Sequence, residues 1–347
     1  MSQSVYVYDP TAADQQSQVR GAGRYLQLLH ENFPEFVFVN ALSSVIYDPS
    51  SIFINPFFNF ISPPLATKRI AQKQVAVIHD LIPLKYSAHF PVGLRGKFNV
   101  WRNKQALKNY DIIITVSEAV KEDVIQMLGI DEKKVKVVYH CLPKMFIERM
   151  KYEVSSMKQE NALYPIPHTS YCLYVGDATW NKNLVNLAKA IKIINVTCVF
   201  VGKVFQRQNL LRATNPWLQE LQQFFAEVNG DKRFIFPGFV SDTELIKLYQ
   251  QATINILPSR DEGFGFSWLE AASQRCPTVA SDIPVFHEIA AGSAVFCDAN
   301  SPNDLANAIG ELYFHKDVRH QWGEKAYERS RFFSAEKFKK DFLRALK

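Results

Sequence analysis

Two glutamates on either side of a glycine-rich turn are the residues of this sequence best suited to chemistry. The stretch SRDEGFGFSWLEAASQRCPTVASD (259–282) places Glu262 before the turn and Glu270 eight positions later. Both side chains are charged at neutral pH, although the turn between them is apolar. Glycines let a ligand approach the backbone, and the free N–H groups at the start of a helix attract anions. Because carboxylates accept hydrogen bonds from neighbouring hydroxyl groups, the stretch suits a phosphorylated sugar.

A purely structural interpretation of the two glutamates is simpler. Glu262 would cap the helix that begins near Phe266, and Glu270 would be exposed to solvent. However, Gly263 and Gly265 lie between the carboxylates, on a loop that follows a predicted strand. We therefore favour a ligand-binding role.

Basic and histidine side chains follow several other predicted strands. Lys182, in the stretch WNKN, would either offset phosphate charge or lie on the surface at the start of a helix. Lys203 directly follows Gly202 at the end of another strand. His79 ends an apolar strand and precedes DLIPL, where it is either a ligand-binding residue or a histidine of the core. Ligands of open α/β sheets bind at the carboxyl ends of the strands, so these positions are candidates for ligand contact.

The stretch RGAGRY predicts a flexible loop between the first strand and the first helix. Gly21 and Gly23 would let an acceptor or a diphosphate approach the backbone. Arg20 and Arg24 would bind phosphate or simply solvate the loop. A dinucleotide-dependent oxidoreductase is disfavoured, because Leu26 occupies the third glycine position of Gly-x-Gly-x-x-Gly.

Short β-branched or aromatic segments alternate with longer helical patterns along the whole chain. The first half predicts strands at 4–9, 36–41, 75–80, 112–117 and 135–140, and helices at 21–31, 94–109 and 118–128. The second half predicts strands at 171–177, 196–202, 233–238, 254–259, 277–282 and 293–298, and helices at 181–193, 216–228, 242–251, 266–275 and 302–314. Near-continuous apolar strands between helices indicate parallel sheets covered on both faces. The predicted fold class is therefore α/β, with two Rossmann-like domains.

The length of 347 residues also favours two domains, because a single core usually stops growing at about 250–300 residues. We expect an N-terminal domain at 1–165, a C-terminal domain at 166–331 and a final helix at 332–347 that crosses back to the first domain. The stretch 148–168, with mixed charge and the sequence YPIPH, indicates a linker. The tail SAEKFKKDFLRALK is an amphipathic helical pattern with a serine cap.

Composition excludes several classes of protein. The net charge of +6 is too small by itself to indicate a nucleic-acid partner. The five cysteines contain no Cys-x-x-Cys pair, so neither a zinc site nor a disulfide framework is indicated. The N-terminus lacks a signal-peptide pattern, and no stretch approaches about 18 apolar residues. We therefore expect a cytoplasmic protein.

Several stretches of this sequence resemble the retaining glycosyltransferases of family 4. The specific part is EGFGFSWLE with its continuation EAASQRCPTVASDIPVFHEIA. Further similar stretches, in order along the chain, are RGAGRYLQLL, HDLIPL, TVSEAVKEDV, YVGDATWNKNL, FPGFVSDTELIKLYQQATINILPS and DANSPNDLANAI. The resemblance spans essentially the whole chain and implies the GT-B architecture, in which two Rossmann-like domains face a cleft. The nucleotide-sugar donor would lie mostly on the second domain and the acceptor on the first.

The resemblance also implies a role for each residue of the site. Glu270 would bind the ribose hydroxyls, and Glu262 would contact hydroxyls of the transferred sugar. Lys182 would offset charge on the leaving nucleoside diphosphate, and His79 would touch the donor sugar near its reacting end. The remaining donor-site positions are Gly263, Phe264, Gly265, Phe266, Gly238, Gly21 and Gly23.

One position departs from the family pattern. Many members have an arginine after the glycine of the strand that precedes WNKN, whereas this chain has Asp177. Lys203 is the substitute that we expect for the missing arginine.

The implied reaction transfers a hexosyl group with retention of the anomeric configuration. Motifs such as GDATWNKN look most like mannosyl- or rhamnosyl-transferring members, so GDP-mannose is the first expected donor. The sequence contains no Asp-x-Asp pair, through which metal-dependent single-domain glycosyltransferases hold Mn²⁺ or Mg²⁺. We therefore expect no metal and no cofactor besides the nucleotide-sugar co-substrate, with Lys182 and a helix N-terminus replacing the metal.

Residues 81–110 form a basic segment that contains no Asp or Glu. Its basic and aromatic residues are Lys85, Phe90, Arg95, Lys97, Phe98, Trp101, Arg102, Lys104, Lys108 and Tyr110. Such a segment suits peripheral contact with an anionic membrane or a lipid-diphosphate-linked glycan, and the alternative is a solvated basic helix. Aromatic residues among basic ones also occur in RNA-binding proteins, but the sequence contains no nucleic-acid module.

Two functions remain compatible with these patterns. The leading prediction is an enzyme that transfers a hexosyl group from a nucleotide sugar to a glycan or lipid-linked glycan. The alternative is a non-catalytic protein of the same fold that binds a sugar nucleotide or acts as a scaffold, which Asp177 keeps open.

Overall fold

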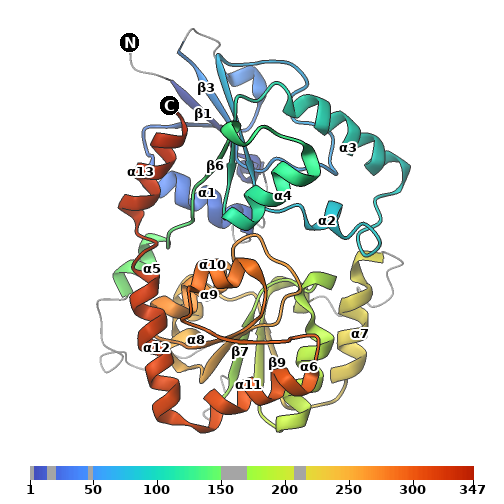
Figure 1. The fold of residues 1–347 in the computed structure, drawn as a ribbon, viewed down its shortest axis with the longest axis vertical. Helices are drawn as coiled ribbons and strands as arrows, with labels where there is room; N and C mark the ends of the chain where they lie inside the picture. The colour runs from blue at the N-terminus through green and yellow to red at the C-terminus, as the bar shows by residue number, and fades with distance from the viewer. Residues whose placement is uncertain (1–3, 14–20, 46–49, 150–169, 207–215) are drawn as a thin grey trace. The chain divides into compact units, whose positions relative to one another are not determined.

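The computed structural model describes residues 4–13, 21–45, 50–149, 170–206 and 216–347. It divides into two compact units, Met1–Pro143 with Phe333–Lys347, and Lys144–Phe332. Each unit has its own six-stranded sheet, in which all neighbouring strands are parallel. Helices cover the sheets, as near-continuous apolar strands require (Figure 1). The α/β class with two parallel-sheet domains is confirmed.

The sheet of the first unit has the strand order β2-β1-β3-β4-β5-β6. Its strands are β1 (Val5–Tyr8), β2 (Val37–Val39), β3 (Ile52–Asn55), β4 (Lys73–Ile78), β5 (Ile112–Thr115) and β6 (Val135–Val137). Its helices are α1 (Gly21–Asn32), α2 (Ile82–Lys85), α3 (Gly93–Leu107), α4 (Glu118–Leu128) and α13 (Ala335–Ala345). The sequence-based prediction missed β3, a run of only four residues directly before a proline, although it lies fully buried between β1 and β4.

The C-terminal helix α13 packs on the first unit. Phe338 and Phe342 lie on its buried face, and their rings are 5.9 and 5.0 Å from that of Phe33 at the end of α1. Lys73 Nζ, at the start of β4, donates a hydrogen bond of 2.8 Å to the carbonyl oxygen of Leu346. Ser334 caps the helix by accepting from the backbone N–H of Lys337. Burial of the two phenylalanines therefore fixes the end of the chain on the first sheet's unit.

The sheet of the second unit has the order β12-β11-β10-β7-β8-β9. Its strands are β7 (Cys172–Val175), β8 (Cys198–Val201), β9 (Phe234–Gly238), β10 (Ile254–Leu257), β11 (Thr278–Ser281) and β12 (Val295–Cys297). Its helices are α5 (Lys144–Arg149), α6 (Leu184–Ile194), α7 (Gln219–Val228), α8 (Asp242–Gln251), α9 (Phe266–Ser273), α10 (Pro284–Ala290), α11 (Pro302–Phe314) and α12 (Lys316–Ser330). Contacts of α5 with α8 and α9 assign α5 to this unit, whereas the sequence-based boundary lay at residue 165.

Local sequence explains where several helices begin and end. Ser241 and Glu244 form a reciprocal capping box at the start of α8. Ser301 caps α11, and Pro302 occupies its first turn, where no hydrogen bond from a backbone N–H is needed. Gly129 ends α4 with a φ of 65°, a left-handed conformation that glycine adopts without a steric penalty.

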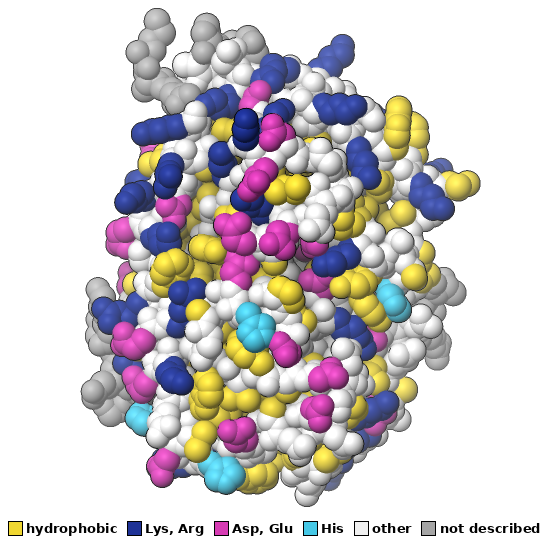
Figure 2. Space-filling view, in the orientation of Figure 1, with side chains coloured by type: hydrophobic (Ala, Val, Ile, Leu, Met, Phe, Trp, Pro, Cys, Tyr) yellow, Lys and Arg dark blue, Asp and Glu magenta, His cyan; other side chains and the backbone are white. Residues whose placement is uncertain are grey.

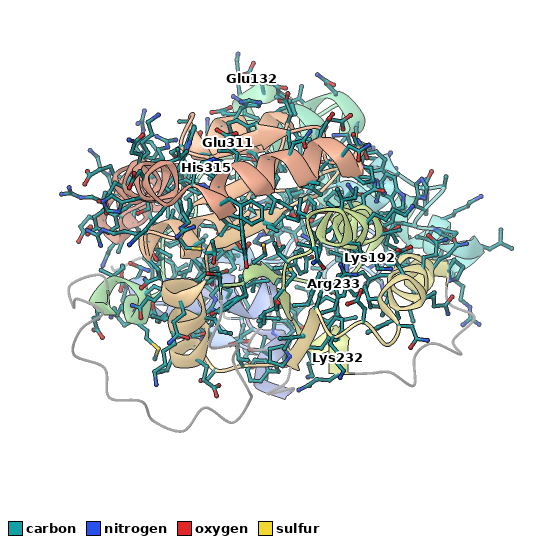
Figure 3. All side chains as sticks on the ribbon, turned by 90° about the horizontal axis from the view of Figure 1, so that it is seen from below. Glu132, Lys192, Lys232, Arg233, Glu311 and His315 are labelled. Atoms are coloured by element: carbon teal, nitrogen blue, oxygen red, sulfur yellow. The ribbon has the colours of Figure 1, made fainter. Side chains whose placement is uncertain are left out.

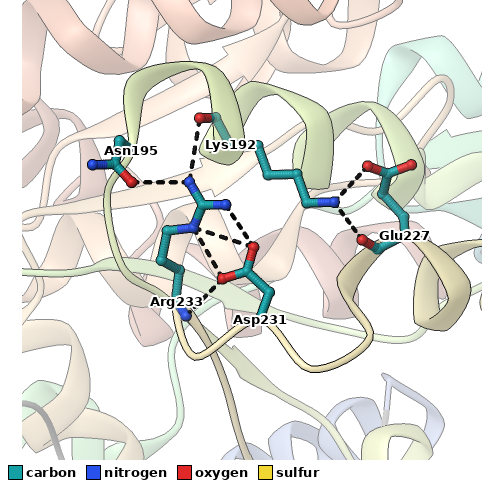
Figure 4. Close-up of polar contacts among 5 residues, drawn as sticks. All are labelled: Lys192, Asn195, Glu227, Asp231 and Arg233. Atoms are coloured by element: carbon teal, nitrogen blue, oxygen red, sulfur yellow. Dashed lines mark hydrogen bonds and ion pairs between the residues drawn. The ribbon is translucent and has the colours of Figure 1, made fainter.

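The main core of the second unit lies between the sheet and helices α6, α7 and α11. Its central side chains include the fully buried rings of Phe200 and Phe224, which are 5.0 Å apart. At the carboxyl end of α6, charged residues join this helix to α7 and to β9. Lys192 Nζ is 2.8 Å from Glu227 Oε1. Arg233, directly before β9, donates to the carbonyl oxygen of Lys192 at 3.3 Å and to Asn195 Oδ1 at 2.9 Å (Figures 3 and 4). These contacts tie down the end of α6 that is remote from Lys182.

Candidate active site

The second sheet has a topological switch point between β7 and β10. These two strands are neighbours in the sheet, yet the chain runs from β7 outward to β8 and β9, and from β10 outward to β11 and β12. Loops at such a point diverge and leave a crevice at the carboxyl ends of the strands, where ligands of open α/β sheets bind. Lys182 follows β7 and Glu262 follows β10. The strand order thus brings together two residues that are 80 positions apart in the sequence.

Lys182 and Glu262 form a direct ion pair. Lys182 Nζ lies 2.5 Å from Glu262 Oε1, and the two side chains are 21% and 13% exposed. The same carboxylate oxygen accepts a hydrogen bond of 2.7 Å from Ser259 Oγ. Glu262 therefore does not cap α9 but neutralises the lysine that the sequence-based prediction assigned to phosphate.

Asn183 holds the loop of Lys182 in place. Its φ of 57° lies in the left-handed region, which asparagine tolerates better than most residues with a Cβ. The side chain is fully buried, and its Nδ2 donates to the carbonyl oxygens of Pro258 at 3.0 Å and Ala299 at 2.7 Å. A further bond of 2.7 Å joins the N–H of Arg260 to the carbonyl oxygen of Asn181. The two loops of the switch point are thus cross-linked by hydrogen bonds.

The glycine turn brings the backbone close to its surroundings, as expected. Gly265 has a φ of 86° and immediately precedes α9. A Cβ at this position would lie 2.7 Å from Cε1 of Phe286, so any larger residue would clash as well as strain the backbone. Phe264 and Ser267 are buried beside it. Gly265 therefore lets the chain turn sharply and approach Phe286 closely directly before α9.

Glu270 is not a solvated surface residue. It lies on α9 with only 4% of its surface exposed, and its Oε2 accepts a hydrogen bond of 3.1 Å from the hydroxyl of Tyr249 on α8. Burial and the nearby charge of Glu270 raise the pKa of Tyr249, so the phenol remains a hydrogen-bond donor. A buried carboxylate held in one orientation is suited to accepting hydrogen bonds from ligand hydroxyls.

Glycines end the three strands on the other side of the switch point. A Cβ on Gly202, after β8, would lie 2.2 Å from the carbonyl oxygen of Gly176, after β7. The N–H of Gly202 donates 2.9 Å to the carbonyl oxygen of Gly238, which ends β9 with a φ of 80°. Lys203, at the start of a single 3₁₀ turn (Lys203–Gln206), is partly exposed at this edge. Asp177 is exposed, and its Oδ1 accepts from the N–H of Ala178.

A polar pocket of about 220 Å³ lies at the carboxyl ends of β10, β11 and β12. Ser259, the hydrogen-bond partner of Glu262, lines it together with the buried Asn183. Its rim carries the exposed carboxylates of Asp282 and Asp298. Burial, helped by these nearby negative charges, raises the pKa of Cys297 in the pocket wall to about 12. The pocket thus combines hydroxyl, amide and carboxylate groups with the side chain of Arg260.

Arg260 is a site residue that the sequence-based prediction missed. Its guanidinium donates to the carbonyl oxygen of Trp180, lies 4.9 Å from the centre of the Trp180 ring and is 3.6 Å from Glu220. It therefore lies beside the loop that carries Lys182, where the buried Glu220 offsets its charge. The available signal was its position two residues before Glu262, on a loop already identified as functional.

In the first unit, His79 is packed against other aromatic rings at the carboxyl edge of the sheet. Its Nε2 lies 2.9 Å from the carbonyl oxygen of Pro56, and its ring is 4.7 Å from Tyr25 and 5.7 Å from His140. Burial lowers the pKa of His79 to about 4. Burial and the neighbouring His79 likewise lower the pKa of His140. Both imidazoles are therefore neutral at physiological pH.

His140 and Tyr25 were also missed from the sequence. His140 follows β6 as His79 follows β4, so the parallel sheet brings both to one edge. The position of His140 at the end of the strand predicted at 135–140 was a usable signal. No comparable signal marked Tyr25, which lies in the middle of an amphipathic helix.

The RGAGRY segment differs from the loop that was expected. Gly21 and Gly23 lie in the first turn of α1, because the helix begins at Gly21. The side chain of Arg24 is largely buried, and its Nη1 donates 3.0 Å to Gln27 Oε1 one turn along the helix. Arg20 lies outside the described residues.

The described part of the chain holds neither a metal-binding cluster nor a membrane-spanning helix. It contains no group of three or more His, Cys, Asp or Glu side chains arranged to hold a metal ion. None of its helices is both long and apolar enough to cross a membrane.

Comparisons with known proteins are consistent with this geometry. One family model, described as Glycosyltransferase Family 4, matches residues 4–143, and another, described as Glycosyl transferases group 1, matches residues 161–329. The O-antigen chain mannosyltransferase RfbU of Salmonella typhimurium is 26% identical over 70% of this chain and 62% of its own length. The serotype-specific mannosyltransferase WbdA of Escherichia coli is 26% identical over 67% of this chain and 29% of its own length.

This chain therefore spans less than two thirds of the length of either curated relative. Among solved structures, Anabaena Alr3699/HepE in complex with UDP-glucose has a TM-score of 0.66 at 15% identity, with 99% of each chain covered. This likeness confirms the fold.

Proposed function

Because the chain belongs to the glycosyltransferases of family 4 and group 1, we propose that it transfers a hexosyl group from a nucleotide sugar to a glycan or lipid-linked glycan. The ion pair between Lys182 and Glu262 at the switch point is the observation that most supports this function. It places a cation for a diphosphate and a carboxylate for sugar hydroxyls within one hydrogen bond of each other. GDP-mannose is the proposed donor, in line with the names of the mannosyltransferases RfbU and WbdA.

Three sets of groups in the second unit bind the three parts of the donor: its diphosphate, its transferred sugar and its ribose. The diphosphate binds Lys182 and the N–H groups at the start of α9, where the helix dipole favours an anion. On donor binding Lys182 turns from Glu262 to the diphosphate, and Glu262 then accepts hydrogen bonds from the transferred sugar. Glu270, oriented by Tyr249, accepts hydrogen bonds from the ribose hydroxyls.

The proposed reaction retains the anomeric configuration. The bond between the anomeric carbon and the β-phosphate oxygen breaks, and the acceptor oxygen forms a new bond to the same face of that carbon. The acceptor hydroxyl proton passes to the departing phosphate oxygen. Lys182 stabilises the negative charge that grows on the diphosphate, and preorganised charge of this kind is usually the largest catalytic contribution.

Positive side chains take the place of the arginine that is missing at Asp177. Lys203 remains the proposed partner of Lys182, because it follows the neighbouring strand β8 at the same edge of the sheet. Arg260, which is paired with Glu220, is an arginine beside the loop of Lys182 and lies on the β10 side. We propose that these cations make the transfer independent of a metal ion.

His79 of the first unit is proposed to contact the donor sugar. The neutral imidazole has one donor and one acceptor. Nε2–H donates to the carbonyl oxygen of Pro56, which leaves Nδ1 to accept a hydrogen bond from a sugar hydroxyl. The hydrogen bond to Pro56 also fixes the orientation of the ring. Gly21, Gly23, Arg24 and Arg20 are proposed to contribute to donor or acceptor binding from the same unit.

A panel of nucleoside diphosphates tests the donor site. GDP, UDP, dTDP and ADP are added to the purified protein in the presence of EDTA, and the thermal midpoint is measured. A ligand at one hundred times its dissociation constant adds about 2.7 kcal/mol to the free energy of unfolding, so a single binding nucleotide will stand out. No shift with any of the four nucleotides would contradict a metal-independent donor site.

A non-catalytic sugar-nucleotide-binding protein is the second candidate. The exposed carboxylate of Asp177, in place of an arginine, favours it. Release of the nucleoside diphosphate, by hydrolysis of the bound sugar nucleotide or by transfer of its sugar, distinguishes an enzyme from a non-catalytic protein. Release that is lost in Glu262→Gln identifies an enzyme, whereas tight binding without any release identifies the alternative.

A further inference from the structure

Helix α3 of the first unit presents a row of large apolar side chains to the surface. Leu94, Phe98 and Trp101 are 87%, 57% and 57% exposed. Their spacing of four and three residues puts them on one face of the helix, and the rings of Phe98 and Trp101 stack at 5.8 Å. Single exposed apolar side chains are ordinary, but a contiguous row of three marks a surface for interaction.

The opposite face of α3 is anchored to the unit, so the row does not result from a loosely packed helix. Asn103, Ala106 and Leu107 are buried on that face. Asn103 Nδ2 donates hydrogen bonds to the carbonyl oxygens of Phe60 at 3.1 Å and Ser62 at 2.8 Å. The helix therefore has one face committed to the core and one face available.

Basic side chains border the apolar row on both sides. At about 100° of rotation per residue, three lysines fall on one flank of the row and two arginines on the other. These flanking residues are Lys97, Lys104 and Lys108, and Arg95 and Arg102. The guanidinium of Arg102 is 5.8 Å from the centre of the Phe98 ring. Figure 2 shows basic and hydrophobic side chains together over the α3 region at the upper right.

No acidic side chain offsets this charge locally. Residues 81–110 contain no Asp or Glu. Among the residues that the structure describes, no ion pair joins any of the five flanking basic side chains to a carboxylate. The partner of this face must therefore offer both negative charge and an apolar medium.

We propose that the outward face of α3, formed by Leu94, Phe98 and Trp101 with the five flanking basic residues, docks on a bilayer that contains anionic lipids. Helices with an apolar row between basic flanks lie in the plane of the bilayer interface, with the apolar side chains below the headgroups and the basic ones at the level of the phosphates. Tryptophan is especially favourable at this depth because its ring is amphipathic. A nucleic acid would satisfy the charges but not Leu94 and Phe98.

Within the basic segment 81–110, this proposal assigns membrane binding to one face of helix α3. Membrane binding by this face is independent of sugar transfer. Binding to vesicles needs neither donor nor acceptor, so its failure would leave the proposed glycosyltransferase function untouched. If both hold, the enzyme works at the surface where a lipid-linked acceptor is found.

Vesicle sedimentation tests the docking. The full chain is mixed with vesicles of phosphatidylcholine alone, or of equal parts of phosphatidylcholine and phosphatidylglycerol. Binding to the mixed vesicles is expected to exceed binding to phosphatidylcholine alone by at least about ten-fold, because each basic residue near the surface adds about five-fold. The double variants Phe98→Ser/Trp101→Ser and Lys97→Glu/Lys104→Glu should each lose about ten-fold or more of that binding.

Two control variants change side chains of the same types, apolar and basic, at exposed positions outside α3. Phe314→Ser removes a side chain that is 63% exposed on α11, and Lys133→Glu/Lys340→Glu reverses two exposed lysines outside α3. Both should bind within about two-fold of the unmodified protein. Circular dichroism of every variant checks that it is folded, and all changed side chains lie at least partly on the surface.

Insertion of the apolar row is measured separately by fluorescence. Brominated acyl chains should quench part of the tryptophan emission, and Trp101→Phe should abolish that part while it keeps the binding within about two-fold. The chain has five tryptophans, so this variant identifies the one that is quenched. Unchanged binding by the two α3 double variants, no quenching at Trp101, or retention on a poly(U) resin without binding to vesicles would each overturn the proposal.

Discussion

Replacing Glu262 with glutamine should strengthen the binding of a free nucleoside diphosphate. Lys182 Nζ is held 2.5 Å from Glu262 Oε1, so a diphosphate must compete with the carboxylate for the lysine. The two side chains are 21% and 13% exposed. The burial of this ion pair is therefore intermediate between that of a surface pair and that of a fully buried pair. The pair is therefore worth about 1–2 kcal/mol, and its loss should tighten binding of the diphosphate about five- to thirty-fold.

Lys182→Met should have the opposite effect. It removes a charge-assisted hydrogen bond worth about 1.5–3 kcal/mol, so binding of the same nucleotide should weaken about ten- to hundred-fold. Glu262→Gln should nevertheless abolish most of the turnover, because its proposed role is to bind the transferred sugar, which a free diphosphate lacks.

Isothermal titration calorimetry with the nucleoside diphosphate that gives the largest thermal shift measures both variants. The matched control is Glu227→Gln, which neutralises the carboxylate of a similar ion pair with Lys192, 2.8 Å long, at the far end of α6 (Figure 4). It should leave the affinity within about two-fold. If Glu262→Gln weakens binding as much as Lys182→Met does, the carboxylate of Glu262 does not compete with the diphosphate for Lys182.

Three further predictions concern other parts of the two units. Glu270→Gln should weaken nucleotide binding about ten-fold in the same titration. The control Glu324→Gln changes an exposed ion pair with Arg275 and should leave the affinity unchanged. Equal affinities of these two variants for the nucleotide would refute the ribose role of Glu270. Burial lowers the pKa of His79 from 6.5 to about 4. Between these two pH values the unfolded chain therefore binds more protons than the folded protein. The free energy of unfolding should fall as the pH decreases from 6.5 to 4, by at most about 3 kcal/mol. His79→Gln should reduce that fall in urea unfolding measured across this range, and an unchanged slope would show that the imidazole is not buried as a neutral group. Asn183→Ala should cost about 2–4 kcal/mol of unfolding free energy, because it loses three side-chain hydrogen bonds and strains a left-handed residue. Asn183→Gly should cost less in the same urea experiment, and the reverse order would contradict the backbone argument.

The sequence by itself determined the repeated strand and helix pattern and therefore the two parallel-sheet domains. Periodicity shows these elements because each strand is apolar over nearly its whole length and each helix has an apolar face. It did not reveal β3, since four residues before a proline are too few to distinguish a strand from a loop. It gave two placements for Gly21 and Gly23, in a loop or at the start of a helix at 21–31, and the structure begins α1 at Gly21.

The glycine turn and its two glutamates were also identified from the sequence alone, because chemistry and spacing were both unusual there. Only the tertiary structure decided what each side chain contacts. The strand order puts β7 beside β10, and Lys182 and Glu262 meet for that reason. Packing of α8 on α9 buries Glu270 under Tyr249. Such contacts depend on non-local strand pairing and helix packing, which hydrophobic periodicity along the chain does not specify.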